Sequence, residues 1–445
     1  MQRAIWWTLA TLLAFLALEA ALFRTGFYFR YVQPNSTTGF VEDHLFWLRH
    51  TPPNPGGEVL VFGDSRVAEG FSGPLATAEG KNRITFWNFG IPGMSVRNWF
   101  YLLRDADPHR NRFRAIVFSL ERYADNDSYD NPPDRVWDLN YSAGRLRLAD
   151  CLDFTLSIHR PDRRQTALSG CLFKGLPLRA DIHEFLENPA RRIQDAKAWR
   201  NNGLLWENAY RGMPQNLVGL SADFKTGTIA FPPGSDEPLK DTIRATVTPQ
   251  FAPDRGETTG YRKQWLGRMI DLYRGTPTRI VFIEMPRAPL PVPEAGVPPR
   301  FIRSIEGTPG VTVLPAQTFR EFEQPELFHD GLHLNTKGQA LFSAKLARAV
   351  LDILEGRAAF AAASRPEASA TEDARRSPRL DPRLQRLCEN CAQGLCSQAE
   401  ENRDRLLFRV TKPLRESRDG AKKAVCTGFS GPRSQPNTRE PEFSH

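Results

Sequence analysis

Short apolar runs alternate with longer amphipathic stretches over most of the chain. The runs predict β-strands at residues 58–62, 83–88, 115–120, 278–285 and 310–314. The amphipathic stretches predict helices at residues 96–105, 259–274 and 337–354. Strands that are apolar throughout are typical of a parallel sheet covered by helices on both faces. The pattern therefore predicts a three-layer α/β/α fold of the flavodoxin-like kind, in which active residues gather at the carboxyl ends of the strands.

Changes in composition divide the chain into four parts. Residues 1–30 contain the longest apolar stretch, residues 31–57 read as a linker that ends in a run of prolines and glycines, and residues 58–356 hold the predicted strands and helices. Residues 357–445 are rich in arginine and lack hydrophobic periodicity, so we expect a disordered basic tail. Within the main domain, residues from about 125 to 251 break the alternation. They predict a large insertion, either a lid or substrate wall or a packing appendage.

The N-terminal apolar stretch, residues 4–23, is long enough to cross a membrane, because about 20 residues at 1.5 Å rise span a bilayer core. An uncleaved anchor, a cleaved signal peptide and a buried core helix are the alternatives. We favour the anchor, because the stretch ends in the bulky residues Leu22 and Phe23, where a cleavage site would have small ones. The flanking arginines do not set the orientation. We expect the body on the periplasmic or extracellular side of a bacterial cell membrane.

Charge and cysteines narrow the possible partners. The net charge of +8 lies largely in the tail, and no basic run is interleaved with aromatics, so we expect no nucleic-acid partner. Cys151 and Cys171 would form a disulfide in an exported domain or remain two buried thiols. The other cysteines lie in the tail without the second pair of a zinc site, and the acidic run at 125–130 lacks the glycine and glutamate of a calcium loop. We therefore expect no metal and no cofactor. The tail cysteines are Cys388, Cys391, Cys396 and Cys426.

Two short segments carry the candidate chemistry. Ser65 follows the first predicted strand in the turn Gly63-Asp64-Ser65, and Asp330 and His333 stand three residues apart near the end of the domain. A serine hydroxyl is a weak nucleophile unless a base takes its proton, and the base needs a group that orients it. These residues predict a catalytic triad in which Ser65 is the nucleophile, His333 the base and Asp330 its orienting carboxylate.

These segments resemble the sequence blocks of the SGNH (GDSL-type) hydrolases. The first block is matched by residues 61–65, with Arg66 in place of the common leucine. The second is similar to residues 88–93, and the Asp-x-x-His block is matched by residues 330–333. The adjacent His329 does not fit the spacing of that block. The resemblance implies an oxyanion hole made by the backbone N–H groups of Ser65 and Gly93.

The third block of the family, Gly-x-Asn-Asp, is missing from residues 119–122, so the third oxyanion donor is unassigned. Asn126 or Arg122 would substitute for it. We expect Asn88 to organise its turn and count it, with Arg122 and Asn126, among the secondary candidates for substrate binding.

Membrane-anchored SGNH-like proteins of bacterial polysaccharide acylation are similar in having one N-terminal span and a diverged third block. The resemblance implies acyl transfer from an oxygen ester, such as an acylated carbohydrate, through an acyl-serine. With water as acceptor the enzyme is an esterase, and with a sugar hydroxyl it is an O-acyltransferase of a cell-surface polysaccharide. The further alternative is a non-catalytic domain that binds glycan or serves as a scaffold for a membrane-bound O-acyltransferase.

Overall fold

A computed structural model describes residues 2–126, 134–201, 213–250, 260–292 and 299–357. Its centre is a five-stranded sheet in the order β2-β1-β3-β6-β7, and every neighbouring pair is parallel. The strands are β1 (Glu58–Gly63), β2 (Thr85–Gly90), β3 (Phe113–Leu120), β6 (Arg279–Glu284) and β7 (Val311–Val313). The predicted parallel sheet is confirmed, and the strand positions agree with the apolar runs to within about two residues.

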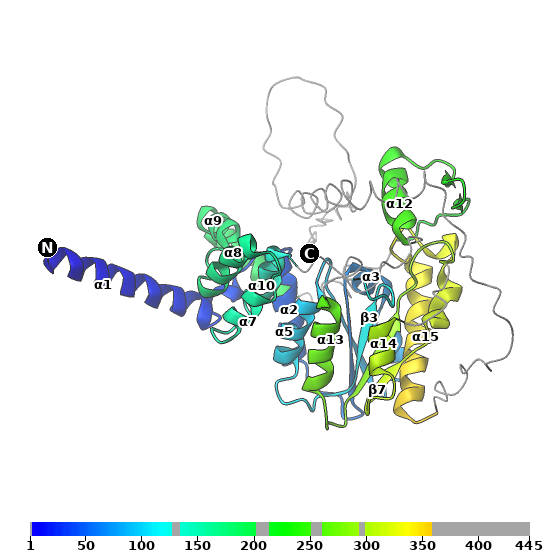
Figure 1. The fold of residues 1–445 in the computed structure, drawn as a ribbon, viewed down its shortest axis with the longest axis horizontal. Helices are drawn as coiled ribbons and strands as arrows, with labels where there is room; N and C mark the ends of the chain where they lie inside the picture. Colours follow the sequence, from blue (N-terminus) through cyan, green and yellow to red (C-terminus); the bar gives the residue numbers. More distant parts are fainter. Residues whose placement is uncertain (1, 127–133, 202–212, 251–259, 293–298, 358–445) are drawn as a thin grey trace, which may run out of the picture.

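Alternate residues of each strand enter separate hydrophobic clusters on the two faces of the sheet. Leu60 and Phe62 of β1 pack with α2 (Thr37–His50), α5 (Val96–Ala106) and α13 (Tyr261–Leu272). Val59 and Val61 pack with α3 (Ser65–Gly70), α4 (Gly73–Glu79) and α15 (Thr336–Leu354). Figure 1 shows α5 and α13 on one side of the sheet and α15 on the other. This arrangement is compatible with three layers, because both faces are buried under helices.

The segment expected to be a linker, residues 31–57, contains the packed helix α2. Ser36 caps this helix by accepting a hydrogen bond from the backbone N–H of Gly39, and Val41, Leu45 and Leu48 are completely buried against the sheet layer. These apolar positions recur at helical spacing, so the segment belongs to the core, and its description as a linker is corrected accordingly.

The described parts of the insertion lie in two places. Its first part holds α6 (Leu139–Ser142), α7 (Asp150–Leu156), α8 (Pro161–Leu172), α9 (Arg179–Glu187) and α10 (Pro189–Asn201), and Figure 1 shows α7 to α10 beside the end of α1. A disulfide joins Cys151 of α7 to Cys171 of α8. The second part holds the small hairpin of β4 (Ser221–Asp223) and β5 (Thr228–Ala230), followed by α12 (Glu237–Gln250). Figure 1 shows α12 at the end of the sheet where α3 begins.

The N-terminal helix α1 (Gln2–Glu19) continues through a π-helical turn (Ala20–Arg24) and projects from the body (Figure 1). It is long and apolar enough to be a membrane span or a signal sequence, and almost none of it is buried in the protein. The predicted tail, residues 357–445 with its four cysteines, lies outside the described residues except for Arg357.

Candidate active site

Ser65 is the first residue of α3, directly after the turn that ends β1. Asp64 caps the helix, and its Oδ1 accepts a hydrogen bond from the backbone N–H of Arg66 at 2.9 Å. The neighbouring strand allows α3 to approach closely, because a side chain at Gly90 would collide with the backbone of Ala68. These contacts place the buried Ser65 hydroxyl at the carboxyl edge of the sheet.

Asp330 and His333 lie in a turn that leads into α15. The Oδ1 atom of Asp330 accepts hydrogen bonds from the backbone N–H groups of Leu332 and His333, both at 2.7 Å. Asn335 caps α15 by accepting from the backbone N–H of Gly338 at 2.9 Å. Hydrogen bonds to backbone N–H groups therefore hold the side chains of Asp330 and Asn335, one at each end of the turn.

The fold brings the three predicted residues into one chain of contacts. The Nε2 atom of His333 lies 2.9 Å from Ser65 Oγ, and its Nδ1 atom lies 2.8 Å from Asp330 Oδ2. Burial acts to raise the pKa of Asp330, but the charge of His333 and the hydrogen bond to it act more strongly and hold that pKa well below its ordinary value. A carboxylate that stays ionised can orient the imidazole and stabilise its protonated form.

A second carboxylate, Glu69, lies beside the same imidazole. Its Oε2 atom lies 3.4 Å from His329 Nε2 and 3.9 Å from His333 Nδ1. Burial acts to raise the pKa of Glu69, but the two histidines, His333 first, outweigh burial and lower it. We did not predict this residue from the sequence. The available signal was its position four residues after Ser65, which places both on one face of α3.

Glu69, His329 and His333 are also the described residues whose ligand atoms lie close enough to one another to hold a metal ion. Both ring nitrogens of His333 already lie at hydrogen-bonding distance from Ser65 and Asp330. This arrangement favours proton transfer by His333 over metal coordination.

The Gly93 turn leaves the sheet next to Ser65, because Gly63 and Gly90 are paired across β1 and β2. Gly93 has φ +70°, a conformation that favours glycine. The two carbonyls of this turn are held from the insertion. Tyr141 donates its hydroxyl to the Pro92 carbonyl at 2.7 Å, and Arg135 Nη2 donates to the Gly93 carbonyl at 2.9 Å. The insertion thus fixes how the Gly93 peptide is oriented.

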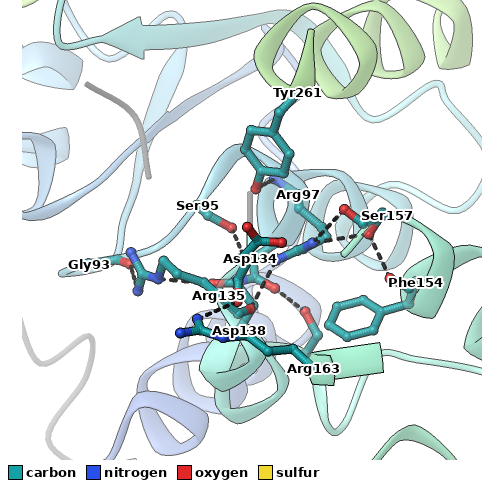
Figure 2. Close-up of polar contacts among 12 residues, drawn as sticks. Gly93, Ser95, Arg97, Asp134, Arg135, Asp138, Phe154, Ser157, Arg163 and Tyr261 are labelled. Carbon is teal, nitrogen blue, oxygen red and sulfur yellow. Dashed lines mark hydrogen bonds and ion pairs between the residues drawn. The ribbon is translucent and has the colours of Figure 1, made fainter. Parts of the chain in front are cut away.

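A buried polar network supports Arg135 (Figure 2). Arg97, which is completely buried, donates from Nη2 to Asp138 Oδ2 at 2.6 Å and to the Arg135 carbonyl at 3.0 Å. Ser95 donates to the same Asp138 oxygen at 2.8 Å, and Arg97 Nη1 donates to Ser157 Oγ at 3.0 Å. The network joins the loop after β2 to the first part of the insertion, which is therefore an integral part of this side of the site.

The secondary candidates occupy different surroundings. The Nδ2 group of Asn88 donates to the carbonyls of Val67, Ala68 and Phe71, and its Oδ1 accepts from the Gly90 N–H. These contacts engage the whole amide of Asn88 in organising its turn, and its place among the substrate-binding candidates stays a prediction.

In the segment after β3, Glu121 forms an ion pair with Arg66, the residue after Ser65. Arg122 and Asn126 are both buried, and the carbonyl of Arg122 accepts a hydrogen bond from Arg262. The structure therefore gives Arg66 an acidic partner in this segment.

The second part of the insertion covers the Asp330–His333 turn. A side chain at Gly331 would collide with Thr246 of α12 and crowd the backbone of Ile243 on the same helix. Residues before the small hairpin also pair with the segments around the turn, because Leu217 N–H donates to the Pro325 carbonyl and Asn335 Nδ2 donates to the Gln215 carbonyl.

Comparison of the chain with protein-family models found no match, and comparison with curated proteins found no similar sequence.

Proposed function

We propose that this protein is a membrane-anchored serine esterase of the SGNH type that cleaves oxygen esters through an acyl-serine intermediate. The observation that carries the proposal is the contact chain from Ser65 Oγ through His333 to Asp330, at 2.9 Å and 2.8 Å. The strand order supports it. Numbered within the sheet alone, the strands run 2-1-3-4-5, which is the flavodoxin-like order, and the nucleophile follows strand 1 at the switch point.

In the proposed reaction, His333 Nε2 takes the Ser65 proton as Oγ attacks the ester carbonyl. The backbone N–H groups of Ser65 and Gly93 stabilise the negative oxygen of the tetrahedral intermediate. His333 then returns the proton to the departing alcohol, which leaves the acyl group on Ser65. Deacylation repeats these steps with an acceptor hydroxyl, while Asp330 holds the imidazole in one tautomer.

A sugar hydroxyl is the second candidate for the acceptor, in place of water. Its support is the packing of α12 over the turn that carries the base, since a covered site limits the access of bulk water to the acyl-serine. The donor and acceptor would then belong to a cell-surface polysaccharide, and the apolar α1 would hold the site close to a membrane-bound O-acyltransferase.

The test uses the full-length protein in nanodiscs with p-nitrophenyl acetate, with and without an added glycan. We expect acetate release and an acetylated Ser65 peptide, both reduced at least about 10³-fold by Ser65→Ala. The matched control is Ser304→Ala, because this serine lies on α14 (Arg300–Ile305) and donates a local hydrogen bond to the Phe301 carbonyl.

The products then separate the alternatives. Acetate as the main product supports the esterase, and acetylated glycan supports the transferase. Equal activity of Ser65→Ala and the wild type would contradict the acyl-serine mechanism. A correctly folded wild type that releases no acetate and acetylates no glycan would favour the glycan-binding or scaffold alternative.

A further inference from the structure

We infer that the α7–α8 hairpin of the insertion is a membrane-docking surface, whose exposed leucines enter the headgroup and acyl boundary of the bilayer that α1 spans. The inference rests on the proposed membrane anchoring by α1 and extends it from a single helix to a second contact. The occupant is lipid.

The exposed leucines are concentrated in this region. Outside α1, seven of them fall between residues 148 and 186, and only Leu75 and Leu341 lie elsewhere in the described part of the body. Leu152 and Leu156 share one face of α7 and are 65% and 55% exposed. Leu168 and Leu172 share one face of α8 in the same way. Large side chains exposed at helical spacing on adjacent helices mark an interaction surface. The seven are Leu148, Leu152, Leu156, Leu168, Leu172, Leu176 and Leu186.

The hairpin is attached directly to the end of the apolar helix that joins the body. Arg24 Nη2 donates to the carbonyls of Cys171 and Leu172 at 2.7 Å and 2.8 Å. The Phe173 ring lies 6.1 Å from that of Phe15, which is well inside the apolar stretch. If α1 crosses a bilayer, the end of α8 therefore lies at the depth of the membrane interface, and Figure 1 shows the helices of this region gathered around the end of α1.

A polar contact on the same side of the helix supports this arrangement. The backbone N–H of Lys174 donates to Glu19 Oε1 at 2.5 Å, and Glu19 is buried. The acidic residue at the end of the span is thus covered by the insertion and is not exposed to lipid. The chain at the end of α8 consequently packs against the end of α1, and the exposed leucines lie on the helices that this segment joins to the anchor.

Charge favours lipid over an acidic or basic protein partner. The acidic residues of α7 are paired with arginines of the body, Asp150 with Arg104 and Asp153 with Arg268. Arg147, beside Leu148, lies 3.7 Å from Asp105 and keeps a side chain that is 65% exposed. Exposed leucines next to an exposed arginine suit a surface that contacts anionic headgroups.

Docking through this hairpin would orient the candidate active site relative to the membrane. The same part of the insertion carries Arg135 and Tyr141, which hold the Gly93 turn. A second contact beside the anchor restricts rotation of the body about α1, so the substrate would meet the carboxyl edge of the sheet from a fixed direction.

The experiment places the photocrosslinking residue p-benzoylphenylalanine at single positions of the full-length protein. The protein is reconstituted in nanodiscs of phosphatidylethanolamine and phosphatidylglycerol, irradiated, and analysed by mass spectrometry for lipid adducts. Position 152 tests the hairpin, position 12 in α1 tests the anchor, and position 341 on α15 is the matched exposed control. We expect lipid adducts at positions 152 and 12 and no lipid adduct at position 341.

An adduct at position 12 without one at 152 would overturn the docking and leave the anchor intact. The absence of adducts at both positions would overturn the anchor together with the docking. The acyl-serine chemistry is tested separately by Ser65→Ala. Irradiation in native membranes completes the test. A protein crosslink that replaces the lipid adduct at position 152 would show that a membrane protein occupies the surface and would overturn the proposal.

Discussion

Asp330 Oδ2 lies 2.8 Å from the Nδ1 atom of His333, while Oδ1 of the same carboxylate accepts two backbone N–H groups of its own turn. Both oxygens are therefore engaged, one with the backbone and one with the imidazole. The carboxylate cannot rotate without breaking the turn that presents the histidine. A mutation can consequently remove the negative charge of this side chain while it keeps the hydrogen bonds that hold the turn.

The variant Asp330→Asn keeps the turn but reverses the tautomer of His333. The asparagine carbonyl can still accept from the Leu332 and His333 N–H groups, so its NH₂ group faces the imidazole and must donate to Nδ1. Nε2 then carries the proton and cannot accept one from Ser65. We expect kcat for ester hydrolysis to fall by about 10³- to 10⁴-fold with unfolding behaviour close to that of the wild type. Asp330→Ala is the comparison, because it removes both the turn contacts and the orienting group. A near-normal kcat in Asp330→Asn would contradict the proposed role.

Removal of the second carboxylate tests the electrostatics around the same imidazole. Glu69 lies close to His329 and His333, and their mutual attraction lowers the pKa of Glu69. By reciprocity, the ionised Glu69 favours the protonated form of the nearby His333 imidazole. In Glu69→Gln, we expect the acid limb of the pH profile of kcat/KM to move to lower pH, because the base loses a neighbour that stabilises its protonated form. The measurement is the rate from pH 4.5 to 9.

Glu79→Gln is the control for this profile, since Glu79 pairs with Arg348 on the surface, away from the histidines. A shift of the acid limb to higher pH, or an equal shift in both variants, would contradict the assignment.

The arginine that holds the Gly93 turn offers a third test. In Arg135→Met the Gly93 carbonyl loses the hydrogen bond from Nη2, so the turn that carries the Gly93 N–H is held less firmly. We expect kcat to fall by up to about 10²-fold while KM changes little, because an oxyanion donor acts in the transition state. Arg163→Met is the matched control, since Arg163 donates to the Asp134 carbonyl on the exposed side of the same segment. Equal losses in both variants would indicate a general structural effect.

The sequence was sufficient for the sheet and for the three central residues of the site. Strands buried on both faces leave continuous apolar runs, and β1, β3 and β6 follow those runs to within about two residues. Asp330 and His333 are recognisable because their spacing is local. The contact of Glu69 with the histidines was not predicted, because its partner His329 is 260 residues away and only the packing of α3 against that turn brings them together. Arg135 depends in the same way on the path of the insertion.

The helix α2 was missed for a different reason. Its apolar positions have helical spacing, but aromatic and polar residues around them obscure the pattern, and the following prolines and glycines suggest a boundary. The structure shows that it covers one face of the sheet, where His44 packs edge-on to Phe89 of β2 at a ring distance of 5.2 Å. A buried histidine in a core helix has a measurable consequence for stability.

Burial lowers the pKa of His44 to about 4, and the hydrogen bond between its Nδ1 and the Phe40 carbonyl, at 2.7 Å, only partly opposes this. The unfolded chain has a histidine pKa near 6.5. A group whose folded pKa is lowered contributes stability that is complete above the unfolded value and is lost as pH falls through the folded one. His44 should therefore reduce the free energy of unfolding by up to about 3 kcal/mol between pH 6.5 and pH 4.

In His44→Asn, whose Nδ2 can keep the bond to Phe40, this dependence should disappear. Tryptophan fluorescence during urea unfolding at pH 7.5, 6, 5 and 4 measures the difference between the two proteins. That difference should shift in favour of the variant as the pH falls, whereas parallel curves would show that His44 is not buried in its neutral form.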